Sequence, residues 1–243
     1  MLTRVMRSIE EDMMSLEGKQ LRYLIGGDDS APGKEDEITE LGFDAEAPPK
    51  HGIGVKYCNL FDEQYDAKKK TGNYGPYLTG SDTARQYGEG QIDPRGPGWI
   101  KNLNDQFARA KAQGFTYIEL DNPDAYDVGD VVAAVDRAET YGLKVIAKNP
   151  GLVEGDRKRY VAHRNVVGMI VEKDAGTPDE MEALRCSAGR PTLPVWFVAF
   201  GGGKAWADKT AQAAKKYCHM GVTHSTKGEY GNATDVLMPV KAG

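Results

Sequence analysis

The sequence predicts an α/β protein folded as a single (β/α)8 TIM barrel, and three observations support this class. Eight short apolar segments with strand character begin near residues 21, 52, 76, 117, 144, 166, 195 and 220. From the fourth onward, helical periodicity fills the intervals, whose length of about 25 residues suits one strand, one helix and their loops. Most of the segments end in Gly, Asp, Asn or Ser, which are typical turn residues.

Eight such units in 243 residues fit one closed barrel. The alternative is an open doubly wound sheet, but no Gly-x-Gly-x-x-Gly motif follows the first expected strand. We expect the barrel to span residues 21–243. Residues 1–20 are expected to form an N-terminal helix that caps the bottom of the barrel, because Leu2, Ile9 and Met13 recur at helical spacing.

In the first third of the chain, strands are expected at residues 21–25, 52–58 and 76–79. Residues 30–50 are rich in Pro, Gly and acidic side chains and lack clear periodicity, so we expect a loop there. Residues 86–98 are dense in Gly and Pro and predict a second long loop. Loops of this length in a compact domain are often functional.

The remaining two thirds alternate regularly between strands and helices. Strands are expected at residues 117–120, 144–148, 166–172, 195–200 and 220–224, and helices at 100–114, 127–142, 156–163, 177–189 and 204–218. Gly114 is expected to end the first of these helices. The helix that begins at Thr177 carries a capping box with Glu180, and Pro178 stands at its first position.

The fourth expected strand ends in Asp121 and then stops in a turn. Alternation places Tyr117, Glu119 and Asp121 on one face of this strand, and the intervening Ile118 and Leu120 on the other. One polar face and one apolar face suit a barrel strand, which turns one side to the lumen and the other to the helices.

Functional groups of a barrel lie at the carboxyl ends of its strands, so side chains there are the first candidates. Asp121 ends the fourth expected strand and Glu172 the sixth, which places their carboxyl groups about 5 to 9 Å apart. This range covers both retaining and inverting glycosidases, whose oxocarbenium-like transition state needs one ionised and one protonated carboxyl group. In the alternative interpretation, Asp121 caps a helix and Glu172 pairs with Lys148 or Lys173.

A longer pattern around these residues resembles glycoside hydrolase family 114. It comprises a strand followed by Asp-Asn within residues 114–126, a Lys-Asn pair at residues 148–149 and Val-Glu-Lys at residues 171–173. The match extends over about residues 91–200. Pro123 departs from the pattern, since relatives more usually have valine at this place.

The resemblance implies a TIM-barrel glycosidase that cuts within an α-linked, amino-sugar-containing polysaccharide, as endo-α-1,4-polygalactosaminidases do. It implies Asp121 and Glu172 as the catalytic pair. By analogy with other barrels that cleave α-glycosides, Asp121 is assigned as the nucleophile and Glu172 as the general acid/base of a retaining reaction. Asn122 and Asn149 would hydrogen-bond sugar hydroxyl groups, and Lys148 would lower the pKa of a neighbouring carboxyl group.

Acidic and aromatic side chains near the expected strand ends complete the candidate substrate-binding set. The acidic ones would receive the ammonium group of an amino sugar: Asp28, Asp29 and Asp93. Tyr57 and Trp99 would offer stacking surfaces for sugar rings, and Trp196 is included because it lies on the seventh expected strand.

Composition excludes several other classes of partner. With a net charge of −5 at pH 7 and a pI near 5.5, the chain offers no basic face for nucleic acid. It contains no run of about 18 apolar residues, so we expect no membrane span. We expect a monomer that binds a polysaccharide. The N-terminal region lacks the apolar core of a secretory signal, which leaves the compartment open: we expect a secreted protein if a signal has been removed, and a cytoplasmic one otherwise.

No cofactor and no metal are expected. The four histidines include no pair at ligand spacing, and the three cysteines are far apart. A metal enzyme would need a third acidic or histidine ligand near the carboxylates, where the chain offers Lys148 instead. Two alternatives to a glycosidase remain: a carbohydrate-binding or structural barrel without turnover, and an enzyme in which Lys148 forms a Schiff base. The intact acid pair favours the glycosidase.

Overall fold

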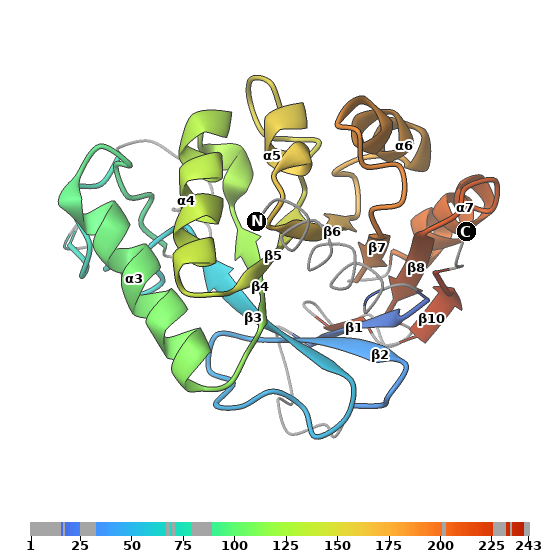
Figure 1. The fold of residues 1–243 in the computed structure, drawn as a ribbon, viewed down its shortest axis with the longest axis horizontal. Coiled ribbons are helices and arrows are strands. Elements are labelled where there is room, and N and C mark those ends of the chain that lie inside the picture. Colours follow the sequence, from blue (N-terminus) through green and yellow to red (C-terminus); the bar gives the residue numbers. More distant parts are fainter. Residues whose placement is uncertain are drawn as a thin grey trace, which may run out of the picture.

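The computed structural model describes residues 16, 18–24, 33–66, 69, 71–78, 89–200, 203–225, 232–233 and 235–240. Within these residues the chain forms a mostly parallel barrel of strands, with helices on its outside (Figure 1). The strands and helices alternate along the chain from β3 onward. The expected TIM-barrel class is therefore confirmed.

Eight strands pair in parallel, each with the next along the chain. They are β1 (Gln20–Leu24), β2 (Glu37–Leu41), β3 (Ile53–Asn59), β4 (Tyr117–Asp121), β5 (Lys144–Lys148), β6 (Val166–Glu172), β7 (Val195–Ala199) and β8 (Met220–His224). Because all eight run in the same direction, their carboxyl ends meet at one rim of the barrel.

Two short antiparallel strands lie where the first and last parallel strands meet. β9 (Asn232–Ala233) pairs with β1, and β10 (Asp235–Met238) pairs with β8. The Thr223 hydroxyl donates a hydrogen bond of 2.9 Å to the Leu21 carbonyl oxygen, which links β8 directly to β1. These contacts nearly close the barrel within the described part of the chain.

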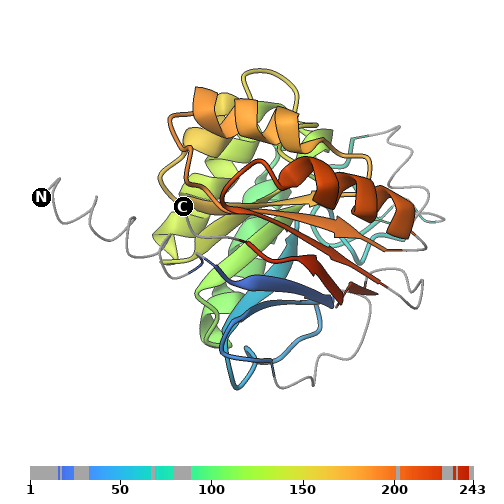
Figure 2. The same ribbon diagram turned by 90° about the vertical axis from the view of Figure 1, so that its right-hand side faces the viewer.

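The described helices cover the outside of β3 to β8 (Figure 2). They are α3 (Pro97–Ala112), the short 3-10 helix η1 (Pro123–Ala125), α4 (Val128–Thr140), α5 (Lys158–Ala162), α6 (Pro178–Ser187) and α7 (Lys204–Ala214). The connections that follow β1 and β2 contribute no helix within the described ranges. Among the helices that are described, none has the length and apolar character needed to cross a membrane.

Local sequence signals explain where these helices begin and end. The Asp127 carboxylate caps α4 by accepting hydrogen bonds from the backbone N–H groups of its first turn, the shorter being 2.6 Å. Thr177 and Glu180 form the expected capping box at the start of α6. Gly114 follows α3 with a φ of 88°, a left-handed conformation that favours glycine.

Apolar side chains form two separate cores, one inside the barrel and one between strands and helices. On β4, Tyr117 belongs to the inner core, whereas Ile118 and Leu120 belong to the outer core, as the alternation predicts. Leu16 is fully buried in the inner core. The remainder of the predicted N-terminal helix lies almost entirely outside the described residues, so that prediction is untested.

The first third of the chain differs from the sequence prediction. Residues 37–41, expected in a loop, form β2 instead. Residues 76–78 form no strand, since Tyr77 makes only an isolated bridge to Ile92. Pro76 has no backbone N–H for a strand ladder, which disfavours the predicted strand. The number of parallel strands is thus eight, as expected, but the second strand lies in the segment interpreted as a loop.

Candidate active site

Three neighbouring strands end in polar residues that turn the chain sharply. The residues after β4, β5 and β6 include Asn122, Asn149 and Asp174, with φ angles of 58°, 42° and 69°. Asn and Asp adopt this left-handed conformation more readily than most side chains, because their short polar groups can hydrogen-bond locally. The turns end the strands at the rim and leave the last strand residues, Asp121 and Glu172, at the mouth of the barrel.

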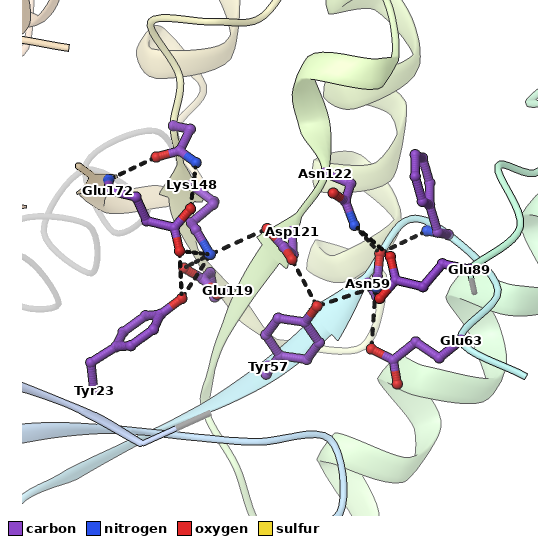
Figure 3. A network of polar contacts seen from close by, with 12 residues as sticks. Tyr23, Tyr57, Asn59, Glu63, Glu89, Glu119, Asp121, Asn122, Lys148 and Glu172 are labelled. Carbon is purple, nitrogen blue, oxygen red and sulfur yellow. Dashed lines mark hydrogen bonds and ion pairs between the residues drawn. The ribbon is translucent and has the colours of Figure 1, made fainter. Parts of the chain in front are cut away.

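Lys148, the last residue of β5, lies between these two carboxylates (Figure 3). Its Nζ is 3.2 Å from Asp121 Oδ1 and 3.2 Å from Glu172 Oε1, and its side chain is only 1% exposed. It also lies 3.4 Å from Glu119 Oε1 and donates a hydrogen bond of 2.7 Å to the Tyr23 hydroxyl. The two predicted carboxylates are therefore brought together around one buried ammonium group.

The Asp121 carboxylate is held by two groups of different kinds. Its Oδ2 accepts a hydrogen bond of 2.7 Å from the Tyr57 hydroxyl, and its Oδ1 faces Lys148. Burial raises the pKa of Asp121, but the charge of Lys148 and the Tyr57 hydrogen bond outweigh it and leave the pKa below its ordinary value. Asp121 is consequently ionised at neutral pH, which is the state a nucleophile needs.

The Glu172 carboxylate is fixed mainly by Asn149. Asn149 Nδ2 donates to Glu172 Oε2 at 2.9 Å, and its Oδ1 accepts from the Glu172 backbone N–H, also at 2.9 Å. The Tyr23 hydroxyl donates to Oε1 at 3.2 Å. The side chain of Glu172 is nevertheless 22% exposed and that of Asp121 20%, so both carboxylates remain accessible from the rim.

Removing the Tyr57 hydroxyl tests its effect on Asp121. In Tyr57→Phe, we expect the pKa of Asp121 to rise, because the variant loses a hydrogen bond to the charged carboxylate, an interaction worth about 1.5 to 3 kcal/mol. The acid limb of a pH profile of kcat/KM should then move to higher pH, while activity near neutral pH is largely kept. Tyr141→Phe, which changes a tyrosine on the outer surface, is the control, and an unmoved acid limb in Tyr57→Phe would contradict the assignment.

Two of the aromatic candidates are structural. Trp99 is 2% exposed and packs on Tyr126 in the outer core, with ring centroids 4.6 Å apart. Trp196 is 1% exposed, and its Nε1 donates to the Lys19 carbonyl oxygen at 3.1 Å. Lys19 immediately precedes β1, so Trp196 lies at the bottom of the barrel, opposite the rim. Burial of both indoles contradicts the predicted stacking role of Trp99 and the predicted substrate contact of Trp196.

Several other predicted substrate contacts are occupied within the protein. Tyr57 is 8% exposed and bonds to Asp121, so it positions the carboxylate and offers little surface to a sugar ring. Both ends of the Asn149 amide bond to Glu172, and Asn149 is also 8% exposed. Lys148 lies beneath the two carboxylates. Tyr57, Asn149 and Lys148, which were predicted to contact the substrate, therefore contact the candidate catalytic carboxylates instead.

Of the acidic residues that were expected to bind the ammonium group of an amino sugar, only Asp93 lies within the described residues. The Asp93 carboxylate makes two hydrogen bonds of 2.9 Å with the guanidinium group of Arg95, so its charge is balanced within its own loop. Asp28 and Asp29 lie outside the described residues. Phe200, which follows β7, is an aromatic side chain that the sequence did not single out. It stacks on Tyr23, whose hydroxyl bonds to Glu172, with ring centroids 6.1 Å apart.

The structure adds a second polar branch beside Asp121 (Figure 3). Asn59, the last residue of β3, donates to the Tyr57 hydroxyl at 3.1 Å and to Glu63 Oε1 at 3.2 Å. Its Oδ1 accepts a hydrogen bond of 2.7 Å from Asn122 Nδ2, which also lies 3.4 Å from Glu89 Oε2. Burial raises the pKa of Glu63 to about 7 and raises that of Glu89. The only feature of the sequence that could have indicated this branch is the position of Asn59 at the end of an expected strand.

The charge of Lys148 argues against two other kinds of site. Burial lowers the pKa of Lys148, but Asp121, Glu119 and Glu172 outweigh this and hold the pKa well above its usual value. A Schiff-base lysine must be neutral to attack a carbonyl group, so Lys148 is poorly suited to that role. Its ammonium group also occupies the position between the carboxylates that a metal cation would take.

Two other features of the described residues lie apart from this network. Asp136, Glu139 and His163 gather on the outer surface closely enough to hold a metal ion. A groove of about 630 Å³ lies between the loops that follow β5 and β6 and helix α6, and its lining includes Leu152, Asp174 and Met181 but neither candidate catalytic carboxylate. Neither feature contributes a side chain to the candidate active site.

No protein-family model and no curated protein matches this sequence. Solved structures match in fold. The glycoside hydrolase domain of PelA from Pseudomonas aeruginosa aligns with a TM-score of 0.55 at 15% identity, covering 83% of this chain and 92% of that one. This chain has the fold of that glycoside hydrolase domain. A variant of the PelA domain aligns with a TM-score of 0.53, also at 15% identity, covering 82% of this chain and 91% of that one.

A second protein has a similar fold. Ega3 from Aspergillus fumigatus, solved in complex with galactosamine, aligns with a TM-score of 0.59 at 15% identity, covering 91% of this chain and 95% of Ega3. The alignments extend over most of each chain, so the likeness concerns the whole barrel. At this level of identity it establishes the fold, and the chemistry is argued from the side chains of this chain.

Proposed function

We propose that this protein is a glycoside hydrolase that uses Asp121 and Glu172 to cleave an α-linked polysaccharide containing amino sugars. The observation that carries the proposal is the pair of accessible carboxylates at the ends of β4 and β6, held around the ammonium group of Lys148. The fold shared with a glycoside hydrolase domain supports it, as does the resemblance of residues 91–200 to glycoside hydrolase family 114.

The spacing of the two carboxylates supports a retaining reaction. Asp121 Oδ1 and Glu172 Oε1 each lie 3.2 Å from Lys148 Nζ, so the two oxygens are separated by no more than twice that distance. Retaining enzymes hold their carboxyl groups about 5 to 5.5 Å apart, whereas inverting enzymes need about 6.5 to 9.5 Å to admit a water molecule. The short separation of these two oxygens favours the retaining arrangement.

In the proposed reaction, Asp121 attacks the anomeric carbon while protonated Glu172 gives its proton to the leaving glycosidic oxygen. The bond from the anomeric carbon to that oxygen breaks, and a bond to the Asp121 carboxylate forms. Glu172, now ionised, takes a proton from a water molecule whose oxygen displaces Asp121 from the sugar. Lys148 stabilises the ionised form of each carboxylate in turn, because it contacts both.

The polar branch beside Asp121 supports an amino sugar as substrate. Glu63 and Glu89 are partly buried next to Asn59 and Asn122, and ionisation of either would be favoured by a nearby cation. A protonated amino group on the sugar provides such a cation. Ega3, which shares the fold, was solved with galactosamine.

We expect Glu63→Gln and Glu89→Gln each to raise KM for a polymer with free amino groups by about tenfold, since each removes one favourable charge interaction. KM for the N-acetylated form of the same polymer should hardly change, because that form carries no cation. Glu154→Gln, which changes an exposed glutamate outside the polar network around Asp121, serves as the control. Equal losses on both polymers would rule out ammonium recognition by these two residues.

The most informative test of the proposed function is a screen of polysaccharides with analysis of the products by mass spectrometry. Polymers of α-linked galactosamine, free and N-acetylated, belong in the panel together with peptidoglycan-like polymers. Release of oligosaccharides of several lengths from the start of the reaction supports an endo-acting enzyme, and NMR of the first anomer formed decides between retention and inversion. Binding without cleavage of any polymer would favour a carbohydrate-binding barrel.

A further inference from the structure

A second pair of acidic side chains lies inside the barrel, deeper than Asp121 and Glu172. Glu40 comes from β2 and Glu119 from β4, and both are completely buried. Glu119 stands two residues before Asp121, so strand alternation places its side chain on the same inward face, one layer further from the rim (Figure 3). Glu119 is the charged group that acts most strongly on Glu40, so the two buried carboxyl groups are neighbours.

The lack of hydrogen-bond donors around this pair of carboxyl groups, within the described residues, indicates that the pair carries a proton. None of the four carboxyl oxygens of Glu40 and Glu119 accepts a hydrogen bond from an N–H or O–H group in the described part of the chain. Two ionised carboxylates in contact repel each other strongly in a buried environment. A single proton between them converts the repulsion into a strong hydrogen bond from a carboxylic acid to a carboxylate.

The charges around the pair lead to the same conclusion. Lys148 Nζ already lies within 3.4 Å of three carboxyl groups, those of Glu119, Asp121 and Glu172. Three tyrosine hydroxyls also lie close to this cluster: those of Tyr23 on β1, Tyr57 on β3 and Tyr160 on α5. The inward side chains of β6 and β7 at this depth are apolar. An ionised Glu40 would thus have no counter-ion of its own among the described residues.

We propose that Glu40 and Glu119 share one proton and act together as the positioning pair for Lys148. Glu40 carries the proton, and Glu119 remains the anion that faces Lys148 Nζ at 3.4 Å. Glu119 attracts the ammonium group from inside the barrel, while Asp121 and Glu172 attract it from the rim. Lys148 is thereby held 3.2 Å from both candidate catalytic oxygens.

The titration of the pair agrees with this geometry. Burial and the contact with Glu119 keep the pKa of Glu40 well above its ordinary value. Burial also raises the pKa of Glu119, to about 7, against the opposing effect of Lys148. The consequence for turnover rests on the proposed glycosidase function, whereas the shared proton can be detected without any substrate.

Infrared spectroscopy detects the proton directly. The wild-type protein at neutral pH should show the C=O stretch of a protonated, buried carboxyl group, and the difference spectrum between wild type and Glu40→Gln should contain this band. Glutamine keeps the shape of the side chain and a hydrogen-bond donor for Glu119, so the variant is expected to fold. Glu154→Gln is the matched control and should leave the band unchanged. Absence of the band from the wild-type minus Glu40→Gln spectrum overturns the proposal.

Stability as a function of pH gives an independent test. A carboxyl group whose pKa is raised by folding stabilises the protein fully below its unfolded pKa of about 4.3, and this contribution is lost as pH rises through the folded pKa. Glu40→Gln has no proton to lose at this position. Its melting temperature relative to wild type should therefore increase from about pH 5 to about pH 8. A difference that is constant over this range, like that expected for Glu154→Gln, would contradict a shared proton.

The effect on the candidate active site is read from Glu119→Gln. With the anion below Lys148 removed, the ammonium group acts more strongly on Asp121 and lowers its pKa further. The acid limb of the pH profile, which reports ionisation of the nucleophile, should therefore move to lower pH. A purely structural role would lower the rate equally at every pH, and that outcome would exclude positioning through Lys148. If no glycan is cleaved, the two substrate-free tests still decide whether the proton is shared.

Discussion

Asp121→Asn and Glu172→Gln are each expected to reduce polysaccharide cleavage by about 10²- to 10⁴-fold or more, because each removes one half of a two-carboxylate mechanism. Both substitutions keep the side-chain volume, and asparagine and glutamine can keep hydrogen bonds with Tyr57 and Asn149. Folding should therefore be preserved. Initial rates of oligosaccharide release, measured beside circular dichroism spectra, check both parts of this expectation.

A second measurement separates the roles of the two carboxylates. Azide can attack a glycosyl intermediate without a general base, so it should restore partial turnover to Glu172→Gln with an activated substrate but not to Asp121→Asn. Asp174→Asn, which changes an exposed carboxylate at the same rim, is the matched control and should retain full activity. Near wild-type turnover in either catalytic-site variant would refute the proposed mechanism.

Lys148→Met is expected to lower the free energy of unfolding by about 3 to 5 kcal/mol, the range for removing one partner of a buried ion pair. Lys148 is 1% exposed and is the only positive charge that the structure shows in contact with Asp121 and Glu172. Without it, several buried carboxyl groups lose their counter-ion together. Cleavage should also be lost, because the ionised carboxylates are no longer stabilised. Urea unfolding monitored by circular dichroism measures the change.

The loss in Lys148→Met should depend on pH. The pKa of Asp121 is lowered in the native protein, so its ion pair contributes stability above the unfolded pKa of about 3.9 and loses that contribution as pH falls through the folded pKa. The difference between wild type and variant should therefore be large at neutral pH and shrink on acidification below about pH 4. Lys216→Met, at an exposed pair with Asp179, is the control and should show little change at any pH. A small loss at neutral pH would mean that Lys148 does not balance these carboxylates.

Much of the candidate site followed from local sequence patterns. Alternation on β4 placed Asp121 on the inward face at the rim, and the regular spacing of later strands placed Glu172 two strands away. Such patterns depend on the period of side chains along a strand, which the sequence displays directly. The polar turns after β4 and β5 were equally visible, because Asn122 and Asn149 are residue types that accept a left-handed backbone.

The misplaced aromatic residues show where local reasoning stops. Trp196 was selected because it lies on a barrel strand, but it is the second residue of β7 and its indole contacts Lys19 at the bottom of the barrel. Trp99 directly follows the predicted functional loop at residues 86–98, yet it packs in the outer core. Depth along the barrel axis depends on strand register and tilt, which are set by pairing with neighbouring strands.

The sequence by itself determined the class of barrel, its parallel strands except β2, and the two carboxylates at the ends of β4 and β6. The tertiary structure decided the rest of the site. It places Tyr23 beside Glu172, Glu40 of β2 beneath the site, and Lys148 between the two carboxylates. The physical reason is that local patterns treat charged side chains as exposed, whereas burial of a charge depends on partners that come from distant strands. Glu40, for example, is a charged residue type that local patterns place at the surface. It is buried inside the barrel, where Glu119 and Lys148 are its neighbours.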